Sequence, residues 1–269
     1  MDSTLKRYRG ATKAFAIFLS ERYPDLEEAG EWDDAIVEFK QSYPLKKSEM
    51  ENLVAAIEYL FPHFRGQLPW SKAVLKGWAV QHKPRHTVPM GRSHTKLWAA
   101  YLVSFGAVRM GVGVMLQREL GLRPSELLGL RASDIALPES QHRPMSKRAV
   151  FGLGFRRGTK AKRAQAVILR CPVLIGLVRW LLSETDPDEK LFPQSYATYR
   201  KLLSKVDAAI GLDTGFTPHS PRAGFASESI ADGASFIEVK EAGRWVADSS
   251  LRVYIDLVSI GQLTTDLRL

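Results

Sequence analysis

Two arginines, a histidine and a tyrosine are of types that could together break and rejoin a phosphodiester bond. Near the C-terminal end the chain reads His219-Ser-Pro-Arg222, and Tyr254 follows nine residues after Trp245. A second arginine, Arg123, lies far upstream in the run Gly-Leu-Arg-Pro-Ser-Glu-Leu-Leu-Gly-Leu. A guanidinium group can hold two phosphate oxygens at once, and an activated tyrosine hydroxyl is a nucleophile. The set therefore indicates chemistry on a phosphodiester.

Both arginines lie beside a proline at a predicted helix start. Positive charge is unfavourable there, because the helix dipole already gives that end a positive potential. A bound phosphate would remove the conflict, since free backbone N–H groups point the same way. Taken singly, Arg123 and Arg222 read as surface arginines, and His219 as a solvated loop histidine. As a functional residue, His219 would donate to a phosphate oxygen or accept the proton of the nucleophile.

Tyr254 has two interpretations. On a helix that begins after Asp248, it shares an apolar stripe with Leu251 and Val258, and this periodicity alone favours a tyrosine in the core. Trp245 is likewise expected in the core when its residue type alone is considered. A phenol has an unperturbed pKa of about 10. A nucleophilic Tyr254 would therefore need neighbouring positive charge or a general base.

The distribution of charge indicates a polyanion as partner. The formal net charge is +9 and the sequence pI is about 9.6. Neither Asp nor Glu occurs in residues 59–118 or 140–183, although Lys and Arg are frequent in both stretches. Two solvated basic faces would be the plain explanation. Two such long stretches in one chain favour a groove that binds a polyanion.

Composition excludes several other classes of protein. Hydrophobic residues make up 45% of the 269 residues, enough for the core of one large domain or two modest ones. The single cysteine, Cys171, excludes an internal disulfide and a thiolate zinc site, and it fits a reducing compartment. The histidines show no metal-binding spacing, so we expect no metal. No apolar run has membrane-spanning length and no signal-peptide pattern opens the chain, so we expect an intracellular protein without a membrane partner.

The elements that must position these residues are predicted to be mostly helical, and the fold class to be mainly α with a small antiparallel sheet (α+β). Residues 1–82 read as a bundle of short helices, and the proline-containing, basic stretch 83–94 as a linker. Strands are expected over 149–155 and 166–170, joined by a basic hairpin tip at 156–163. Further helices are expected over residues 96–120, 124–130, 172–182, 196–210, 220–233, 236–242 and 249–260.

The ordered set resembles a known family. Arg123, a lysine in a hairpin, His219-x-x-Arg222, Trp245 and Tyr254 occur in the order and spacing of tyrosine recombinases, the phage-integrase family. The run Gly-Leu-Arg-x-Ser-Glu-Leu resembles the first arginine box of that family. The C-terminal boxes are most similar to members of the Cre recombinase type, in which tryptophan replaces the commoner histidine of the third box. The resemblance covers residues 95–260.

Two positions depart from the usual family pattern. Pro221 stands where a leucine is often found between the histidine and the second arginine. The third box carries Arg244-Trp245 in place of glycine and histidine. Neither change removes a residue type that the chemistry requires.

The resemblance implies an architecture and a mechanism. It implies a helical core-binding domain over 1–82, a linker over 83–94 and a catalytic domain over 95–269. The two domains would close around duplex DNA as a clamp. Tyr254 would attack the scissile phosphate and form a 3′-phosphotyrosine link. The catalytic set that would stabilise the charge of the transition state is Arg123, Arg222, His219 and Trp245. The bond energy stays in the phosphotyrosine, so no cofactor is implied.

The resemblance also assigns roles around this set. Lys160 would protonate the leaving 5′ oxygen. Lys162 competes for that role, and counting back from the second strand favours Lys160. Glu126 would be a structural partner of Arg123. Contacts to DNA are expected from the linker, the hairpin tip and the third box, at Lys83, Arg85, Arg92, Arg156, Arg157, Lys162, Arg163 and Arg244.

The implied partners are double-stranded DNA and further copies of the chain, in a tetrameric synapse on DNA. The residues after Tyr254 would form a tail that docks on a neighbouring subunit or folds back on its own domain. Two alternatives remain: a type IB topoisomerase that relaxes DNA, and a DNA-binding regulator without catalysis. The expected location is the cytoplasm or nucleoid, or the nucleus in a eukaryote.

Overall fold

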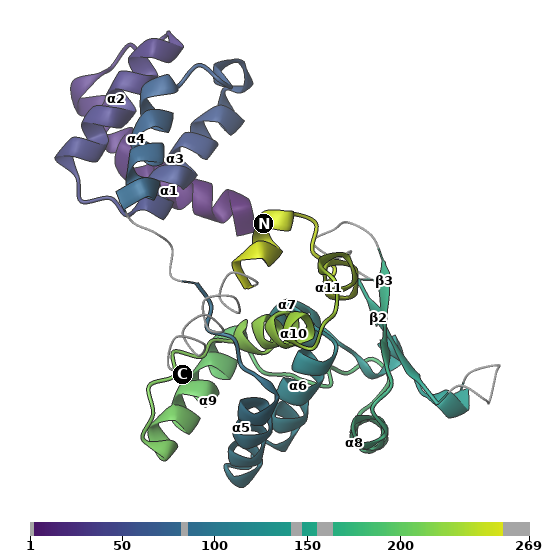
Figure 1. Ribbon diagram of the computed structural model, residues 1–269. Helices are drawn as coiled ribbons and strands as arrows, with labels where there is room; N and C mark the ends of the chain where they lie inside the picture. Colours follow the sequence, from purple (N-terminus) through teal and green to yellow (C-terminus); the bar gives the residue numbers. More distant parts are fainter. Residues whose placement is uncertain (1–2, 82–85, 141–146, 155–163, 255–269) are drawn as a thin grey trace. The chain divides into compact units, whose positions relative to one another are not determined.

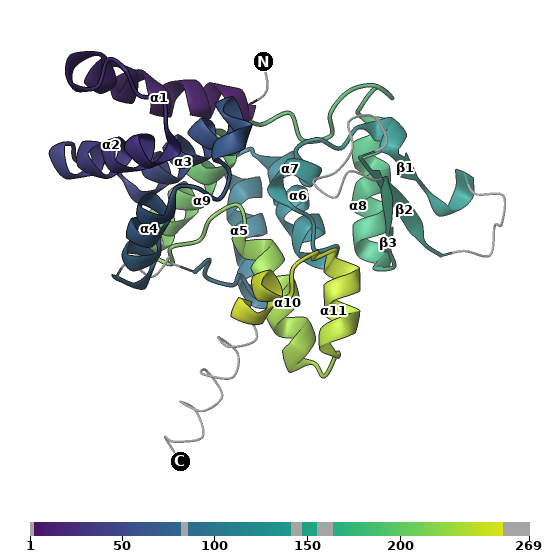
Figure 2. The same cartoon turned by 90° about the horizontal axis from the view of Figure 1, so that it is seen from above.

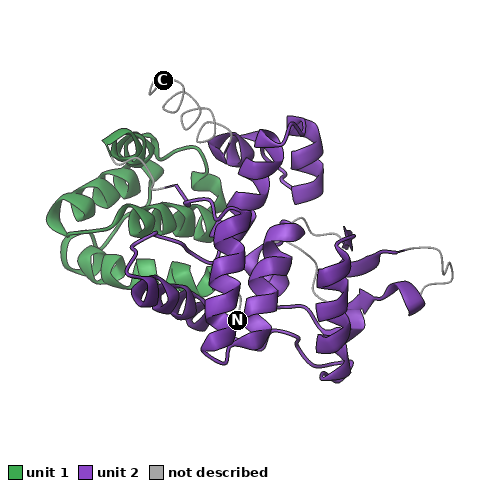
Figure 3. Ribbon diagram, turned by 60° about the horizontal axis from the view of Figure 1, so that its bottom comes forward, with its two compact units in different colours: residues 1–85 green, residues 86–269 purple. Residues whose placement is uncertain are grey.

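The computed structural model describes residues 3–81, 86–140, 147–154 and 164–254 (Figure 1). The chain divides into two compact units, residues 1–85 and residues 86–269 (Figure 3). Each unit has its own hydrophobic core. The predicted fold class is confirmed, because the described residues are mainly helical with one three-stranded antiparallel sheet.

The first unit is a helical bundle. Its core is rich in aromatic side chains, and Phe15, Phe18 and Phe39 contact one another with ring centroids 5.2–6.2 Å apart. A buried carboxylate, Asp33, accepts the backbone N–H groups of Trp70 and Ser71 at 2.7 and 2.8 Å. Asp33 thereby satisfies two N–H groups at the start of the last helix, which helical hydrogen bonds leave open. The helices are α1 (Ser3–Arg22), α2 (Ala29–Ser42), α3 (Lys47–Leu60), η1 (Pro62–Phe64) and α4 (Pro69–Gln81).

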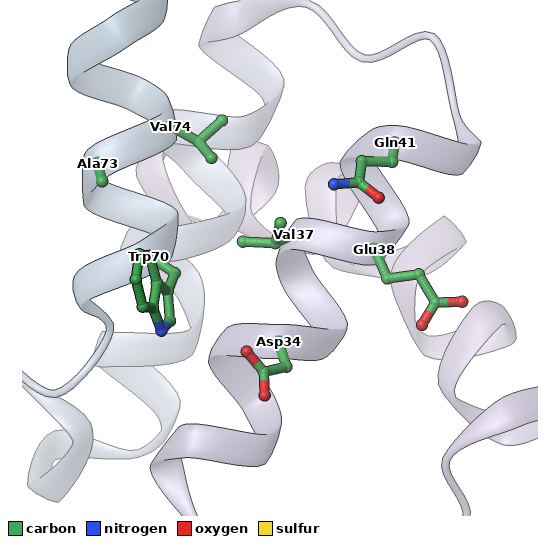
Figure 4. A pocket seen from close by; sticks show the side chains of 7 residues that line it. All are labelled: Asp34, Val37, Glu38, Gln41, Trp70, Ala73 and Val74. Atoms are coloured by element: carbon green, nitrogen blue, oxygen red, sulfur yellow. The ribbon is translucent and has the colours of Figure 1, made fainter.

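A groove of about 700 Å³ lies between α2 and α4 (Figure 4). Trp70, Ala73 and Val74 of α4 lie across it from Val37, and the remaining lining residues on α2 are polar or acidic: Asp34, Glu38 and Gln41. One of the two carboxylates, Glu38, is paired with Arg22.

The second unit begins with two helices where one was expected. Residues 96–120 were predicted as a single helix, and this is wrong: α5 (Arg92–Ser104) ends at a turn, and α6 (Val108–Glu119) packs back against it (Figure 2). Gly106 makes the turn possible with φ +77°, a conformation that costs glycine little. The apolar periodicity runs through the turn because both helices bury side chains in the same core.

The segment after α6 is less helical than its sequence indicates. A helix was expected over 124–130, but α7 (Pro124–Leu127) ends after one turn, and Leu128–Leu130 form a turn and a loop. The sheet follows, with β1 (Ile135–Ala136), β2 (Ala149–Leu153) and β3 (Gln165–Leu169) in the order β1-β2-β3. Strands β2 and β3 pair antiparallel from Ala149–Leu169 to Leu153–Gln165, as predicted, and the predicted tip at 156–163 lies outside the described residues. Two short helices, η2 (Ala132–Asp134) and η3 (Pro138–Ser140), flank β1.

The remaining helices complete the core and carry the C-terminal boxes. They are α8 (Pro172–Ser183), α9 (Tyr196–Ile210), α10 (Ser220–Ala231) and α11 (Phe236–Gly243), and residues 248–254 are helical as well. Helix α10 packs against both α6 and α11 (Figures 1 and 2). Within the described residues, no helix combines the length and the apolar character needed to cross a bilayer.

Glycine lets the entering chain lie directly on α10. The N–H of Met90 donates to the Ser220 carbonyl at 2.9 Å. A Cβ atom on Gly224, one turn along α10, would lie only 1.9 Å from the Met90 carbonyl oxygen. The segment around Met90 is therefore held against the helix that carries Arg222.

Candidate active site

Arg222 lies near the N-terminus of α10 and is only 5% exposed. Its Nη2 donates to the Gly243 carbonyl at 2.5 Å, and its Nη1 donates to the Gly121 carbonyl. Burial, followed by the positive charge of Arg123, lowers its pKa to about 9, so the group remains charged at neutral pH. The neighbouring elements thus hold a buried cation at a fixed position.

Arg123 precedes α7 and is less enclosed. Its Nη1 donates to Glu126 Oε1 at 2.6 Å, and its Nη2 donates to the Arg244 carbonyl at 2.9 Å. The backbone N–H of Arg123 also donates to Glu126 Oε2 at 2.8 Å. Glu126 therefore lies against Arg123 at both its side chain and its backbone.

Arg123 and Arg222 lie at helix N-termini, where the dipole is unfavourable for a cation, and backbone carbonyls from the C-terminal ends of other helices offset this. Gly243 is the last residue of α11 and Gly121 lies two residues after the end of α6, so Arg222 donates to carbonyls at or just beyond two helix C-termini. Carbonyl groups at these ends carry the negative end of the dipole. The carbonyl of Arg244, which accepts from Arg123, comes from the same end of α11. Three backbone carbonyls from two helix ends therefore supply negative potential beside the arginines at the N-termini of α7 and α10.

Arg244 faces inward, although a DNA contact was predicted for it. Its side chain is 6% exposed, and its Nη2 donates to Glu126 Oε2 at 2.8 Å and to the Gly121 carbonyl at 3.2 Å. The residue adopts the left-handed conformation, with φ 59°, where it ends α11. In the described structure its guanidinium contacts Glu126 and the Gly121 carbonyl, and the contact to DNA stays a prediction.

Glu126 is a buried carboxylate between two arginines. Burial by itself raises its pKa, but the charge of Arg244 and the hydrogen bonds from Arg123 outweigh burial, so the pKa stays below its ordinary value. The ionised form is thus the stable one at neutral pH. It sets the position of both arginines.

Trp245 connects Arg222 to the last helix. The Arg222 Cζ lies 4.0 Å from the centroid of the indole ring, a cation–π contact. Phe225 stacks against the same indole with an interplanar angle of 7°. A Cβ on Gly243 would lie 1.5 Å from the ring, so only glycine fits there. The ring is 9% exposed and occupies a closely fitted place.

Tyr254 lies at the edge of this cluster. Its ring centroid is 6.2 Å from that of Trp245, at an interplanar angle of 64°. Burial raises the pKa of its phenol, and the positive charge of Arg222 lowers it by a smaller amount. Tyr254 fits both interpretations of the sequence, as a core residue and as a candidate nucleophile. Its ring packs against a small apolar cluster, and its hydroxyl is close enough to the positive charge of Arg222 for that charge to lower its pKa.

His219 is exposed, unlike the buried Arg222 and Trp245. It directly precedes α10, its residue is exposed, and its ring centroid lies 6.3 Å from that of Tyr196. The helix begins at Ser220 itself, where the sequence had indicated a capping residue. His219 lies about one turn before Arg222, at the same end of α10.

Several predicted positions lie outside the described residues. This group comprises the candidate general acids and most of the candidate DNA contacts: Lys83, Arg85, Arg156, Arg157, Lys160, Lys162 and Arg163. Strands β2 and β3, from which the hairpin extends, are described on both sides. Arg92 begins α5 with an exposed side chain whose Nη2 lies 3.4 Å from Asp232 Oδ2.

One further ion pair was not predicted from the sequence. Arg118 of α6 is 8% exposed at its side chain and pairs with Glu228 of α10. Glu228 also accepts the backbone N–H of Arg92 at 2.7 Å. The signal that could have revealed it is the place of Arg118 two residues after the apolar run from Val112 to Leu116, because a charge near such a buried face requires a partner. No group of three His, Cys, Asp or Glu side chains suited to a metal is found in residues 3–81, 86–140, 147–154 and 164–254.

Comparison with known proteins identifies the family. Residues 82–259, well over half of the chain, match the family described as "Phage integrase family". This chain belongs to the phage integrase family. The match includes each of the arginines, the histidine and the tyrosine singled out above, so the predicted family is confirmed.

Solved structures of phage integrase relatives share the fold. A post-cleavage complex of XerH site-specific recombinase with a palindromic difH substrate is 15% identical, with a TM-score of 0.68, over 97% of this chain and 78% of that chain. The Tn1549 transposon integrase in complex with transposon right end DNA is 11% identical, with a TM-score of 0.58, over 94% and 89%. XerA recombinase is 19% identical, with a TM-score of 0.51, over 100% and 94%. No curated protein sequence matches the chain.

Proposed function

We propose that this phage integrase family member is a site-specific DNA recombinase that cleaves and rejoins strands through a 3′-phosphotyrosine intermediate. The observation that carries the proposal is the contact series from Arg222 to Trp245 to Tyr254, with separations of 4.0 and 6.2 Å. It brings a buried guanidinium into the electrostatic range of a phenol. The solved complexes of XerH and of the Tn1549 integrase with DNA support a duplex as the substrate.

The two arginines would bind the scissile phosphate. Each guanidinium carries five N–H donors, and the contacts described for Arg222 direct only one donor from each terminal nitrogen at a carbonyl. The others could bind non-bridging phosphate oxygens, with His219 contributing from the same end of α10. Fixed donors in a poorly hydrated site stabilise developing charge better than mobile water does.

The proposed reaction keeps atoms and charge in balance. The Tyr254 hydroxyl gives its proton to His219 and its oxygen attacks phosphorus, the bond from phosphorus to the 5′ oxygen breaks, and a proton from Lys160 makes the leaving group a 5′ hydroxyl. A 5′ hydroxyl of a partner strand then attacks the phosphotyrosine and gives its proton to Lys160, while His219 returns its proton to the departing phenol, which restores a phosphodiester and the free tyrosine. One phosphate ester replaces another in each step, so the bond energy is kept and no nucleotide is needed. Strand exchange would take place in a tetrameric synapse on DNA, with residues 1–82 and 95–269 as core-binding and catalytic domains.

The test is to trap the covalent intermediate. A pool of duplexes with a randomised central region and single nicks is incubated with the full-length protein. Adducts that survive denaturation are recovered and sequenced. A nick just downstream of the cleaved bond lets the short fragment with the freed 5′ hydroxyl diffuse away, which blocks religation. We expect adducts from the wild type that share a sequence, and none from Tyr254→Phe.

The other outcomes discriminate between the alternatives. Binding to the pool with no adduct would contradict the proposal and favour a DNA-binding regulator. Adducts without a shared sequence, together with relaxation of any supercoiled plasmid, would favour a type IB topoisomerase. An adduct that persists in Tyr254→Phe would exclude Tyr254 as the nucleophile.

A further inference from the structure

A buried glutamine joins two segments of the candidate site. Gln117 lies in the last turn of α6 and is 0% exposed. Its Nε2 donates to the carbonyl of Pro218 at 2.7 Å and to the carbonyl of Leu122 at 3.2 Å. Its Oε1 accepts the hydroxyl of Tyr199, on α9, at 2.8 Å. One side chain thus links α6, α9 and two loops.

Only one orientation of this amide satisfies its partners. Carbonyl oxygens can only accept, so the amide nitrogen must face Pro218 and Leu122, and the amide oxygen must then accept from Tyr199. The Tyr199 ring is also 0% exposed, which fixes its hydroxyl against the glutamine. A buried polar network in which the members are satisfied specifies a single arrangement of its neighbours.

The two carbonyls belong to the residues that directly precede His219 and Arg123. The backbone adds a further contact, since the N–H of Leu122 donates to the Gln117 carbonyl at 3.0 Å where Gly121 ends the helix. We infer that Gln117, oriented by Tyr199, is a positioning residue that holds the segments bearing His219 and Arg123 in one arrangement. This inference rests on the proposed function for the roles of those two residues.

Two variants and one control separate positioning from simple stability. Gln117→Met keeps the length of the side chain and removes both donors, and Tyr199→Phe removes only the hydroxyl. Leu203→Ala is the control, because Leu203 is 0% exposed one turn further along α9 and contributes no polar contact to the network. The probes are the rate of adduct formation on the duplex selected by the wild type, the affinity for that duplex, and the melting temperature.

We expect Gln117→Met to form adduct about 100-fold more slowly, as displacements of about 1 Å can do. Its affinity for the duplex should be close to that of the wild type. Tyr199→Phe should show a smaller loss of rate, and the double variant should be no slower than Gln117→Met, because Tyr199 acts through the glutamine. Leu203→Ala should lower the melting temperature and leave the rate unchanged. A wild-type rate in Gln117→Met, or equal losses in it and the control, would overturn the inference.

Amide hydrogen exchange on the free protein tests the same idea without chemistry. Faster exchange at residues 122–127 and 219–223 in Tyr199→Phe, and not in Leu203→Ala, is expected. Unchanged exchange there would overturn the inference whatever the catalytic result. A wild type that forms no adduct would overturn the proposed function alone. Tyr199→Phe serves for this measurement because the loss of one hydroxyl leaves the core packing in place.

Discussion

The guanidinium of Arg222 lies over the indole of Trp245, with Cζ 4.0 Å from the ring centroid. The ring of Tyr254 packs against the same indole, and the two ring centroids are 6.2 Å apart. The tryptophan therefore sets the separation between the candidate phosphate-binding residue and the candidate nucleophile. Phe225 stacks against the same indole, and the indole fits in its place only because Gly243 has no side chain. Predictions about the site follow from these contacts.

Removing the charge of Arg222 should make Tyr254 harder to ionise. The positive charge of Arg222 lowers the pKa of Tyr254, while burial raises it. In Arg222→Gln only the effect of burial remains, so the pKa of Tyr254 should be higher than in the wild type. The measurement is the tyrosinate absorbance on raising the pH, corrected with Tyr254→Phe and stopped where the circular dichroism changes. Arg179→Gln, on the exposed side of α8, is the control and should leave the pKa of Tyr254 unchanged. A lower pKa in Arg222→Gln would contradict the assignment.

Alanine at position 243 should displace the indole. A Cβ there would lie 1.5 Å from the Trp245 ring, so the ring must move away from Arg222. We expect Gly243→Ala to lower the melting temperature, shift the tryptophan fluorescence and abolish adduct formation. The matched control is Gly176→Ala in α8, where a Cβ meets nothing within 4 Å, and where alanine should stabilise the helix by about 0.5–1 kcal/mol. Equal behaviour of the two variants would refute the steric argument.

The stabilisation by Glu126 should depend on pH. Its folded-state pKa lies below the ordinary value of 4.5, so its contribution to stability is complete above 4.5 and is lost as the pH falls through the lowered folded-state value. Glu126→Gln should lower the free energy of unfolding by about 3 kcal/mol near neutral pH, because it leaves the buried Arg244 and the partly buried Arg123 without their carboxylate. Urea denaturation of both proteins at a series of pH values checks this. The difference should shrink in acid, and a constant difference would disprove the linkage.

Position 244 should prefer glycine to alanine once the guanidinium is removed. Arg244 has φ 59°, a conformation that costs a residue with a Cβ about 1–2 kcal/mol. Both Arg244→Gly and Arg244→Ala lose the ion pair with Glu126, so they differ chiefly in backbone strain. We expect Arg244→Gly to be the more stable of the two by about 1 kcal/mol in urea denaturation. A more stable alanine variant would show that the strain is absent.

The sequence singled out residues that the fold brings together, whereas several of the elements around them differ from their predicted bounds. The catalytic roles of these residues stay predictions. Residue type and order are enough to single out Arg123, Arg222 and Tyr254, because few combinations of side chains suit a phosphodiester. Helix boundaries depend on weaker local signals. The break at Gly106 was missed because α5 and α6 bury the same kind of side chain in one core, so the apolar pattern continues across the turn.

The inward role of Arg244 could not be read from the sequence. An arginine beside a tryptophan in a basic chain reads as a DNA contact, and only the fold reveals that Glu126 lies 2.8 Å from it. Gln117 was overlooked for a related reason. A glutamine near a helix end is usually solvated, whereas here contacts to Tyr199 and Pro218 come from segments about a hundred residues away.

The three residues from Gly243 to Trp245 constrain how this family member can vary. The Gly243 carbonyl accepts from Arg222, the Arg244 carbonyl accepts from Arg123, and the Trp245 ring covers Arg222. One added or deleted residue here would shift the partners of both arginines at once. Length variation among close homologues should therefore be excluded from this tripeptide and fall instead in the turn at Val246 and Ala247, which carries none of these contacts in the described structure.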